Sequence, residues 1–551
     1  MSFFPIDDTT VALFTAPISP DSPLSVIDKQ ISGDIAKFLN ESIARLQKPL
    51  ADTENDFSDY TITKKPRSAD QYTTDIMEKL VSHSANTASP GFIGHMTSAL
   101  PSFLPSLAKL QTSLNQNVVK LETSNAFTSL EQQVIGMMHH LIYEQDSTFY
   151  QAHMHNAKSA LGVFCSGGTV ANITALWAAR NRLLPADDNF PGIVKAGLAK
   201  GLAHYNYDSA AILISEMGHY SIDKTADLLG IGRENVISIE TDAENKVCVN
   251  AMRRVAKKLQ RQNTAILAIV GIAGSTETGH IDPLEALADL AEELQCHFHV
   301  DAAWGGAALL SENAKPMLKG IERADSVTID AHKQMYAPMG AGMVFFKDPQ
   351  SAHAIQYQAD YIIRGDSQDL GRYSVEGSRA AMALLTHACL EIIGLNGYQR
   401  LIDSSIDRAH YFANLITQHA EFELLTVPEL CLLTYRYTPK SVQQAIDKAI
   451  STNQQNKLTA LNQLLDELTA YIQDTQRKQG KTFVSRTRLK IDKYHKTAVT
   501  VFRVVLANPL TTKKILTDIL DEQEQIAKTN QEVLPKLLKM AQEINSGSLS
   551  P

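Results

Sequence analysis

A lysine that follows an apolar strand-like run has the clearest chemical potential in this sequence. Ser326–Lys333 reads S-V-T-I-D-A-H-K, an alternating, β-branched run that ends in the pair His332-Lys333. A lysine in this place is either a solvated residue at a sheet edge or an amine held in a cleft. Burial lowers the pKa of such an amine and makes it nucleophilic. The dipeptide alone favours a solvated lysine at a sheet edge. The other motifs of the chain determine which of the two interpretations holds.

Asp301 is the second such residue, at the end of the run His297–Asp301 in the motif H-V-D-A-A-W-G-G. A buried carboxylate without a partner is costly. Asp301 therefore either caps the following turn or pairs with a cation such as a protonated ring nitrogen. Ala303, Gly305 and Gly306 would leave room beside it for a flat ring.

A glycine-rich turn forms a candidate phosphate site. Ser166-Gly167-Gly168-Thr169 leads directly into a run with helical spacing. Free backbone N–H groups, the helix dipole and two hydroxyls suit a phosphate. Taken alone, the turn favours the alternative, a plain N-cap in which Thr169 satisfies its own helix. The turn is neither a Walker A loop nor a GxGxxG fingerprint.

Together these groups match what pyridoxal phosphate needs: an amine, a carboxylate for the pyridine nitrogen, a ring stacker and a phosphate cradle. Lys333, Asp301, His219 and Ser166–Thr169 supply them. The sequence lacks the GxSxG elbow of a Ser-His-Asp hydrolase. Zinc is also a poor rival, and no metal is expected, because the paired and alternating histidines lack ligand spacing. These histidines are His139-His140, His153/His155 and His297/His299.

An alternating strand and helix pattern must bring these residues together. The apolar, β-rich runs are Ala210–Ser215, Val236–Glu240, Ala265–Gly271, His297–Asp301, Val327–Asp330 and Gly342–Phe346. The stretches with helical character are Ser221–Leu229, Ala251–Gln262, Pro283–Gln295 and Glu312–Ile321. This alternation predicts βαβ units in a mainly parallel sheet covered on both faces, with one possible antiparallel member. Four runs lead to His219, Thr276, Asp301 and Lys333, at the strand ends where ligands bind.

The flanking regions differ in character. We expect a mostly helical N-terminal segment (1–115), a large α/β domain (116–395) and a small α+β domain (396–551). In the first segment Ile31–Leu46 has helical spacing. In the last, the predicted elements are the strands Leu430–Tyr437 and Ala498–Leu506, the helical stretch Ser441–Lys478 and a final helix Thr512–Ile544.

Composition narrows the class of protein. The chain has 551 residues and a formal charge of −9, which argues against a general nucleic-acid binder. Its five widely spaced cysteines fit a reducing compartment. Met1–Pro20 lacks the basic region of a signal peptide, and the apolar run Ala265–Ala273 is too short to span a bilayer. We therefore expect a cytoplasmic protein without a membrane or nucleic-acid partner.

Five motifs resemble the group II pyridoxal-phosphate-dependent decarboxylases, the glutamate decarboxylase-like branch, over about residues 85 to 545. They are S-E-M-G-H-Y-S-I (215–222), A-G-S-T-E-T-G-H-I-D-P (273–283), H-V-D-A-A-W-G-G (299–306), D-A-H-K (330–333) and D-L-G-R-Y-S-V-E-G-S-R (369–379). Within this family the chain looks most like the bacterial pyridoxal-dependent aspartate 1-decarboxylases. The resemblance implies the fold type I architecture, with a seven-stranded sheet, and an obligate homodimer with active sites at the interface.

The resemblance also implies roles for individual residues. Lys333 would form the Schiff base, and Tyr361 would return a proton to the substrate carbon. Arg503 would bind a substrate carboxylate, and His95 stands where the family contacts the substrate side chain. The implied cofactor-binding residues are Lys333, Asp301, Ala303, His219, Thr276, Ser166, Gly167, Gly168, Thr169 and His332.

The expected reaction is α-decarboxylation of an acidic amino acid, L-aspartate to β-alanine. The resemblance leaves glutamate, 2,4-diaminobutyrate and cysteine sulfinate as alternative substrates. A transaminase or lyase on the same fold is the alternative from another class of enzyme.

Overall fold

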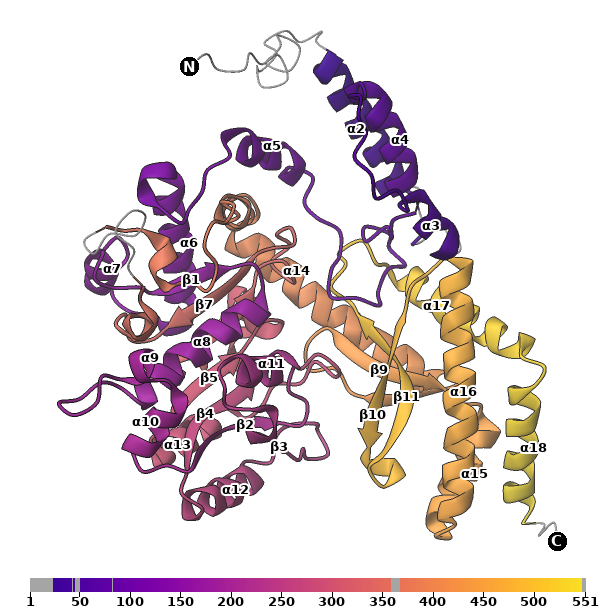
Figure 1. Ribbon diagram of the computed structural model, residues 1–551. Helices are drawn as coiled ribbons and strands as arrows, with labels where there is room; N and C mark the ends of the chain where they lie inside the picture. The colour runs from indigo at the N-terminus through magenta and orange to yellow at the C-terminus, as the bar shows by residue number, and fades with distance from the viewer. Residues whose placement is uncertain (1–22, 42, 45–49, 82, 358–366, 548–551) are drawn as a thin grey trace.

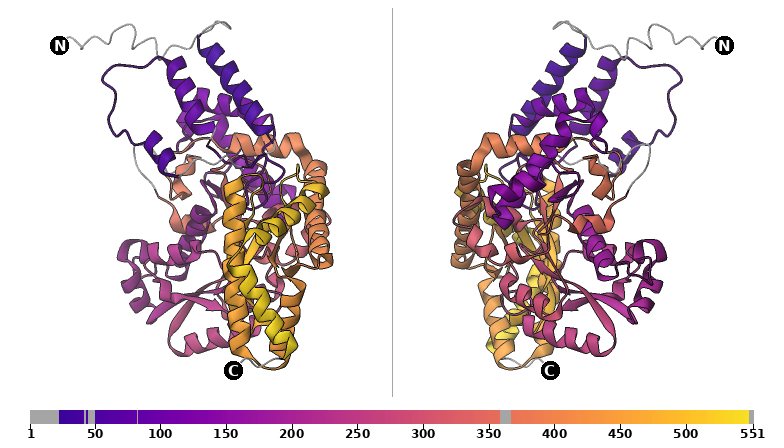
Figure 2. Two further views of the ribbon diagram at one scale, coloured as in Figure 1. Left: turned by 90° about the vertical axis from the view of Figure 1, so that its right-hand side faces the viewer. Right: turned by 90° about the vertical axis from the view of Figure 1, so that its left-hand side faces the viewer.

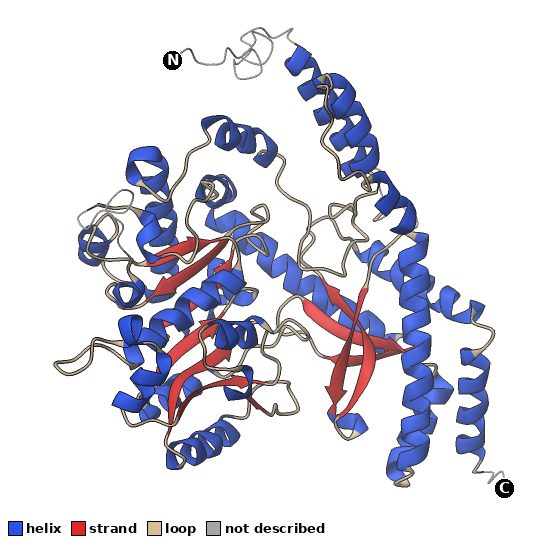
Figure 3. Ribbon diagram, in the orientation of Figure 1, coloured by secondary structure: helices blue, strands red, loops and turns tan. Residues whose placement is uncertain are grey.

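The computed structural model describes the whole chain except residues 1–22, 42, 45–49, 82, 358–366 and 548–551. A seven-stranded sheet lies at the centre of its larger part, in the order β1-β7-β6-β5-β4-β2-β3 (Figures 1 and 3). The strands are β1 (Gly162–Cys165), β2 (Ser209–Ser215), β3 (Val236–Ile239), β4 (Thr264–Ile272), β5 (His297–Asp301), β6 (Ser326–Asp330) and β7 (Gly342–Phe346).

The predicted mainly parallel sheet is confirmed. Strands β3, β2, β4, β5 and β6 pair in parallel, and β7 is antiparallel to both β6 and β1. The runs identified in the sequence did not include β1, because its four residues precede Ser166-Gly167 and resemble the start of a turn.

Alternation along the strands sends side chains to two separate cores. On β2, Ile212 and Ile214 pack with Leu176 of α8 (Gly168–Leu183) and Ile222 of α11 (Ser221–Leu228). Leu213, between them, belongs to the other core. The helices that contribute to this second core are α6 (Ala126–Tyr143), α12 (Val249–Arg261) and α13 (Leu284–Leu294). Helices therefore cover both faces of the sheet, as predicted.

The prediction of a helix over Glu312–Ile321 is wrong. Two short 3-10 turns take its place, Lys315–Leu318 and Ile321–Arg323. Pro316 opens the first turn, and Gly320, with φ of 98°, separates the two. A proline nitrogen cannot donate to a helical hydrogen bond, and left-handed glycine backbone ends a helix.

A four-stranded antiparallel sheet, in the order β10-β11-β9-β8, forms the C-terminal part. Its strands are β8 (Phe422–Thr426), β9 (Leu432–Tyr437), β10 (Ser485–Ile491) and β11 (Thr497–Val505). Its helices are α15 (Lys440–Ser451), α16 (Gln455–Gln479), α17 (Lys513–Thr529) and α18 (Val533–Ser546). The two strands predicted here match β9 and β11, whereas β8 and β10 were not predicted.

Each of the two long helices predicted in this part is a pair of helices. Asn453, with φ of 54°, lies between α15 and α16. Asn530 lies between α17 and α18, and its side-chain oxygen accepts the backbone N–H of Val533 at 2.6 Å. Such a side chain ends one helix and caps the next, a signal weaker in the sequence than a proline or glycine.

The N-terminal helices project from the rest of the molecule (Figures 1 and 2). They are α2 (Pro23–Leu39), α3 (Leu50–Asp56) and α4 (Ala69–Val81), and a separate helix, α5, spans Leu104–Leu114. Helix α2 begins and ends earlier than the predicted Ile31–Leu46. Between α4 and α5 the chain joins the C-terminal sheet, because Ile93 accepts from Val505 N–H at 2.7 Å and donates to Phe483 O at 3.0 Å.

The long helix α14 (Ala383–Gln418) connects the two sheets and is kinked at Gly394. The remaining α-helices are α7 (Ser147–His153), α9 (Ile193–Ala196) and α10 (Leu198–His204). Within the described ranges, no helix combines the length and apolar character needed to cross a bilayer. The domain boundaries expected near residues 115 and 395 stay predictions.

Candidate active site

A cavity of about 410 Å³ opens at the carboxyl ends of the central strands. It receives side chains from the β1–α8 turn, the β2–α11 turn and the ends of β4, β5 and β6. All ten residues predicted to bind the cofactor line it: Ser166, Gly167, Gly168, Thr169, His219, Thr276, Asp301, Ala303, His332 and Lys333. The crossover connections of a parallel sheet account for this convergence, since they return every strand end to the same edge.

Lys333 follows β6 and forms an ion pair inside this cavity. Its Nζ lies 3.1 Å from Oδ2 of Asp330, and the Lys333 side chain is 21% exposed, against 4% for Asp330. The other Asp330 oxygen, Oδ1, is buried without a hydrogen bond. The sequence interpretation gave Asp330 no role, although the residue is visible in the D-A-H-K motif.

The turn before α8 is shaped to receive an anion. A Cβ added to Gly168 would lie 2.8 Å from Oδ2 of Asp330, so only glycine fits there. The Ser166 N–H donates to the Glu376 carboxylate at 3.0 Å, so one backbone donor of the turn already faces a carboxylate oxygen. His332, beside the turn, donates from Nδ1 to the backbone oxygen of Ala341 at 3.1 Å.

At the other side of the cavity, Asp301 lies at the end of β5 and is 8% exposed. One of its carboxylate oxygens accepts from Asn172 Nδ2 at 2.9 Å, and the other accepts from Ala303 N–H at 3.1 Å. These donors orient the carboxylate while leaving lone pairs for a further N–H donor. Asn172, on α8, was missed in the sequence, where it reads as an ordinary polar helix residue.

His219 lines the same cavity. Burial lowers its pKa, with Lys333 acting in the same direction and Asp301 opposing. Its imidazole is therefore neutral near pH 7 and suited to stacking on a flat ring. An amine, a carboxylate, a neutral ring and an anion-accepting turn around one cavity fit pyridoxal phosphate.

Arg503 reaches the edge of this site from the C-terminal sheet. It lies on β11 and donates from Nε to the backbone oxygen of Thr276, a cavity-lining residue, at 2.7 Å. Burial lowers the pKa of Arg503, and Glu277 offsets part of that effect. A guanidinium held by one nitrogen keeps its terminal nitrogens for a bidentate carboxylate.

His95 lies near the same charges. Its Nδ1 is 2.9 Å from Thr97 Oγ1, and its pKa is lowered by burial first and then by Arg503 and Lys333. The structure thus brings His95, Arg503 and Lys333 into one neighbourhood, although neither His95 nor Arg503 belongs to the lining of the cavity itself. Tyr361 falls outside the described residues.

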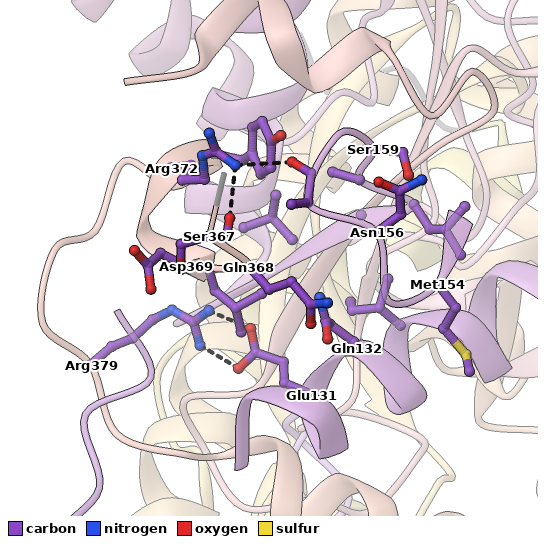
Figure 4. A pocket seen from close by; sticks show the side chains of 18 residues that line it. Glu131, Gln132, Met154, Asn156, Ser159, Ser367, Gln368, Asp369, Arg372 and Arg379 are labelled. Atoms are coloured by element: carbon purple, nitrogen blue, oxygen red, sulfur yellow. Dashed lines mark hydrogen bonds and ion pairs between the residues drawn. The ribbon is translucent and has the colours of Figure 1, made fainter. Parts of the chain in front are cut away.

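A second hollow, which we call the side pocket, lies under the segment 367–379 (Figure 4). On its wall Arg379 donates through both terminal nitrogens to the Glu131 carboxylate, with Nη1–Oε2 at 2.6 Å. Arg372 donates to the backbone oxygens of Ala157 and Ser367 at 2.9 and 2.8 Å. The same segment carries Glu376, which binds the Ser166 N–H. These contacts therefore hold the segment 367–379 against the turn Ser166–Thr169, which we call the phosphate-side turn.

Comparison with known proteins agrees with this geometry. The model of the pyridoxal-dependent decarboxylase conserved domain matches residues 52–438. An aspartate 1-decarboxylase from Aliivibrio fischeri is 53% identical over 530 residues, 96% of each chain. An L-2,4-diaminobutyrate decarboxylase from Rhizobium meliloti is 29% identical over 362 residues, 64% of this chain and 66% of the relative. The crystal structure of mouse CSAD superposes with a TM-score of 0.78 at 23% identity, covering 92% of this chain and 99% of that one.

Proposed function

The chain belongs to the pyridoxal-dependent decarboxylase family, and on this premise we propose that it converts L-aspartate to β-alanine and carbon dioxide. The observation that carries the proposal is that Lys333 and Asp301 line one cavity, while Arg503 donates to the backbone of Thr276, another residue of that lining. Similarity to an aspartate 1-decarboxylase along nearly the whole chain supports aspartate as the substrate.

Each part of the cavity has a proposed partner on the cofactor. Lys333 would hold the aldehyde, Asp301 the pyridine nitrogen and His219 the ring face, with Thr276 and Ala303 beside it. The phosphate would lie against the turn formed by Ser166, Gly167, Gly168 and Thr169, next to His332. When bound, the cofactor supplies the electron sink for the pair left as carbon dioxide departs.

The remaining residues act on the substrate. Arg503 would bind a substrate carboxylate through its terminal guanidinium nitrogens, and His95 would contact the substrate side chain. Tyr361 would deliver a proton to the substrate α-carbon once carbon dioxide has left. Contacts to both substrate carboxylates would determine which carboxylate lies beside the cofactor ring. This matters for the rate, because a misplaced substrate reacts much more slowly.

One assay decides the substrate. Purified protein with pyridoxal phosphate is given aspartate, glutamate, 2,4-diaminobutyrate or cysteine sulfinate, and carbon dioxide and the amine product are measured. We expect aspartate to be turned over most efficiently and to yield β-alanine. Faster turnover of glutamate would overturn the assignment of aspartate, and keto acid in place of carbon dioxide would indicate a transaminase. Lys333→Ala protein is the control for decarboxylation by free pyridoxal phosphate that does not involve the active-site lysine.

A homodimer with active sites at its interface, located in the cytoplasm, is the finer part of this proposal. Exposed apolar side chains on the N-terminal helices, such as Ile35, Leu39, Leu110 and Leu114, support a contact surface for a second copy. Light scattering after gel filtration tests this part. A monomer that retains full activity would contradict it.

A further inference from the structure

Asn172 connects three elements that border the cavity: helix α8, strand β5 and helix α11. It lies on α8, one turn after Gly168 and Thr169, and is 1% exposed. Its Nδ2 donates to Asp301 Oδ2 on β5 and to Ser221 Oγ at the start of α11, both at 2.9 Å. Helix α11 follows the turn that carries His219. One amide thus connects the phosphate-side turn, the ring carboxylate and the stacking histidine.

The orientation of this amide follows from the charge of Asp301. An ionised carboxylate can only accept, so the nitrogen of Asn172 must face Asp301 and the oxygen must face His299. His299 Nε2 lies 3.0 Å from that oxygen and must therefore donate to it. Both amide hydrogens and the amide oxygen of Asn172 are then satisfied inside the protein.

The same logic continues to the start of β5. Because the Nε2 of neutral His299 carries the proton, its Nδ1 accepts from the Ser326 hydroxyl at 2.8 Å. That hydroxyl in turn accepts from His297 Nε2 at 2.7 Å. Burial lowers the pKa of both histidines, so both are neutral near pH 7. The bonds form one directed chain from His297 to Asp301, along a single face of β5.

The alternating histidines therefore have a place in the site. From the sequence, His297 and His299 are considered only as zinc ligands, for which their spacing is unsuitable. Residues two apart on a strand point to the same face, so His297, His299 and Asp301 all face α8. A buried network in which the Asn172 amide and both ring nitrogens of His299 have partners holds these members in one geometry.

We propose that Asn172 is a positioning residue, held by His299, that fixes Asp301 relative to the phosphate-side turn and His219. This inference rests on the cofactor assignment in the proposed function and not on the identity of the substrate. Its test is therefore made on cofactor binding before any amino acid is added.

The first variant is Asn172→Asp. It is nearly isosteric and still accepts from His299, but it places a second carboxylate against Asp301, and two such groups share a proton. The variant loses the hydrogen bond that Asn172 donates to the Asp301 carboxylate. We therefore expect the apoprotein of the variant to bind pyridoxal phosphate about 100-fold more weakly than the native apoprotein does. At saturating cofactor kcat should fall while KM changes little. Thr174→Val is the matched control, because Thr174 is buried on the same helix and its hydroxyl donates to the Val170 oxygen of that helix and not to Asp301 or His299.

The second pair of variants is His299→Gln and His299→Leu, which have similar volumes. The glutamine amide can replace the Nε2–H donor, whereas leucine cannot. We expect cofactor affinity near that of the native protein for His299→Gln and about tenfold weaker for His299→Leu. Equal affinities for the two variants, or native affinity for Asn172→Asp, would overturn the proposal. If Asn172→Asp does not fold, as judged by apoprotein melting, the His299 pair decides alone.

Discussion

The amine of Lys333 lies 3.1 Å from the Asp330 carboxylate, on the floor of the cavity where that amine is expected to react. This pair holds the lysine in place. A covalent bond between Lys333 and the proposed cofactor would replace this free amine. The contribution of Asp330 to stability should therefore depend on cofactor loading.

Asp330→Asn removes this ion pair while keeping the side-chain volume. We expect the free energy of unfolding of the apoprotein to fall by about 2 kcal/mol, as for loss of a charged hydrogen bond, and that of the loaded protein to fall less. Thermal unfolding of both forms measures the difference. Asp348→Asn, at an exposed pair with Arg182, is the control. An equal loss in the two forms would contradict the role given to Asp330.

Lys333→Ala removes the proposed covalent attachment. Borohydride reduction of the native protein should fix the cofactor to the peptide that contains Lys333, as detected by mass spectrometry. In the variant the cofactor should be removed by dialysis, and decarboxylation should be lost. Recovery of the reduced cofactor on another lysine would be evidence against the assignment.

Arg503→Lys keeps the charge but loses the bidentate geometry. We expect kcat/KM to fall by about 100-fold, because a carboxylate clamp contributes about 2–5 kcal/mol. Affinity for pyridoxal phosphate should remain unchanged, since Arg503 lies beside the cavity and not in its lining. Arg488→Gln, at an exposed arginine on the neighbouring strand β10, serves as the control. Unchanged kcat/KM in Arg503→Lys would exclude a substrate contact.

Tyr361→Phe tests the proton donor. Without the phenol, we expect carbon dioxide release to slow and transfer of the substrate amino group to the cofactor to become detectable. Measuring carbon dioxide together with pyridoxamine phosphate separates the two outcomes. Normal decarboxylation without transamination would remove Tyr361 from the proposed mechanism.

His139 makes the fold sensitive to acid. Burial lowers its pKa from 6.5 to about 4, and the hydrogen bond that His139 Nε2 donates to the Phe346 backbone oxygen opposes this shift. Between these values the unfolded chain binds more protons, so the free energy of unfolding falls as pH decreases from 6.5 toward 4. This group contributes up to about 1.4 kcal/mol per pH unit. His139→Gln should flatten the slope by that amount in chemical denaturation series, and an unchanged slope would exclude a buried neutral His139.

The sequence predicts the central sheet better than its surroundings. Strands such as Ala265–Gly271 are continuous apolar runs, because burial on both faces requires apolar residues at every position. Strand β10 alternates Arg486 and Arg488 with less exposed residues, so its composition looks polar. The helix breaks depend on the left-handed backbone of Asn453 and on the side-chain cap of Asn530, and not on a proline.

The same physical distinction applies to the site. Lys333, Asp301 and the glycine turn are recognisable because each stands at the end of an apolar run or opens a helix. Asn172 and Asp330 act through contacts between elements far apart in sequence. Their partners cannot be identified before the order of the strands in the sheet is known, although Asp330 is only three residues before Lys333 in the D-A-H-K motif.

The pairing of β1 with β7 also constrains how the protein is made. Gly162 pairs with Phe345, so the strand that precedes the phosphate-side turn stays unpaired until β7 has left the ribosome. Contacts between such distant residues slow folding and leave sheet edges exposed to aggregation. A nascent chain cannot assemble the cofactor cavity before that point, which makes capture of pyridoxal phosphate a late event in the biogenesis of the enzyme.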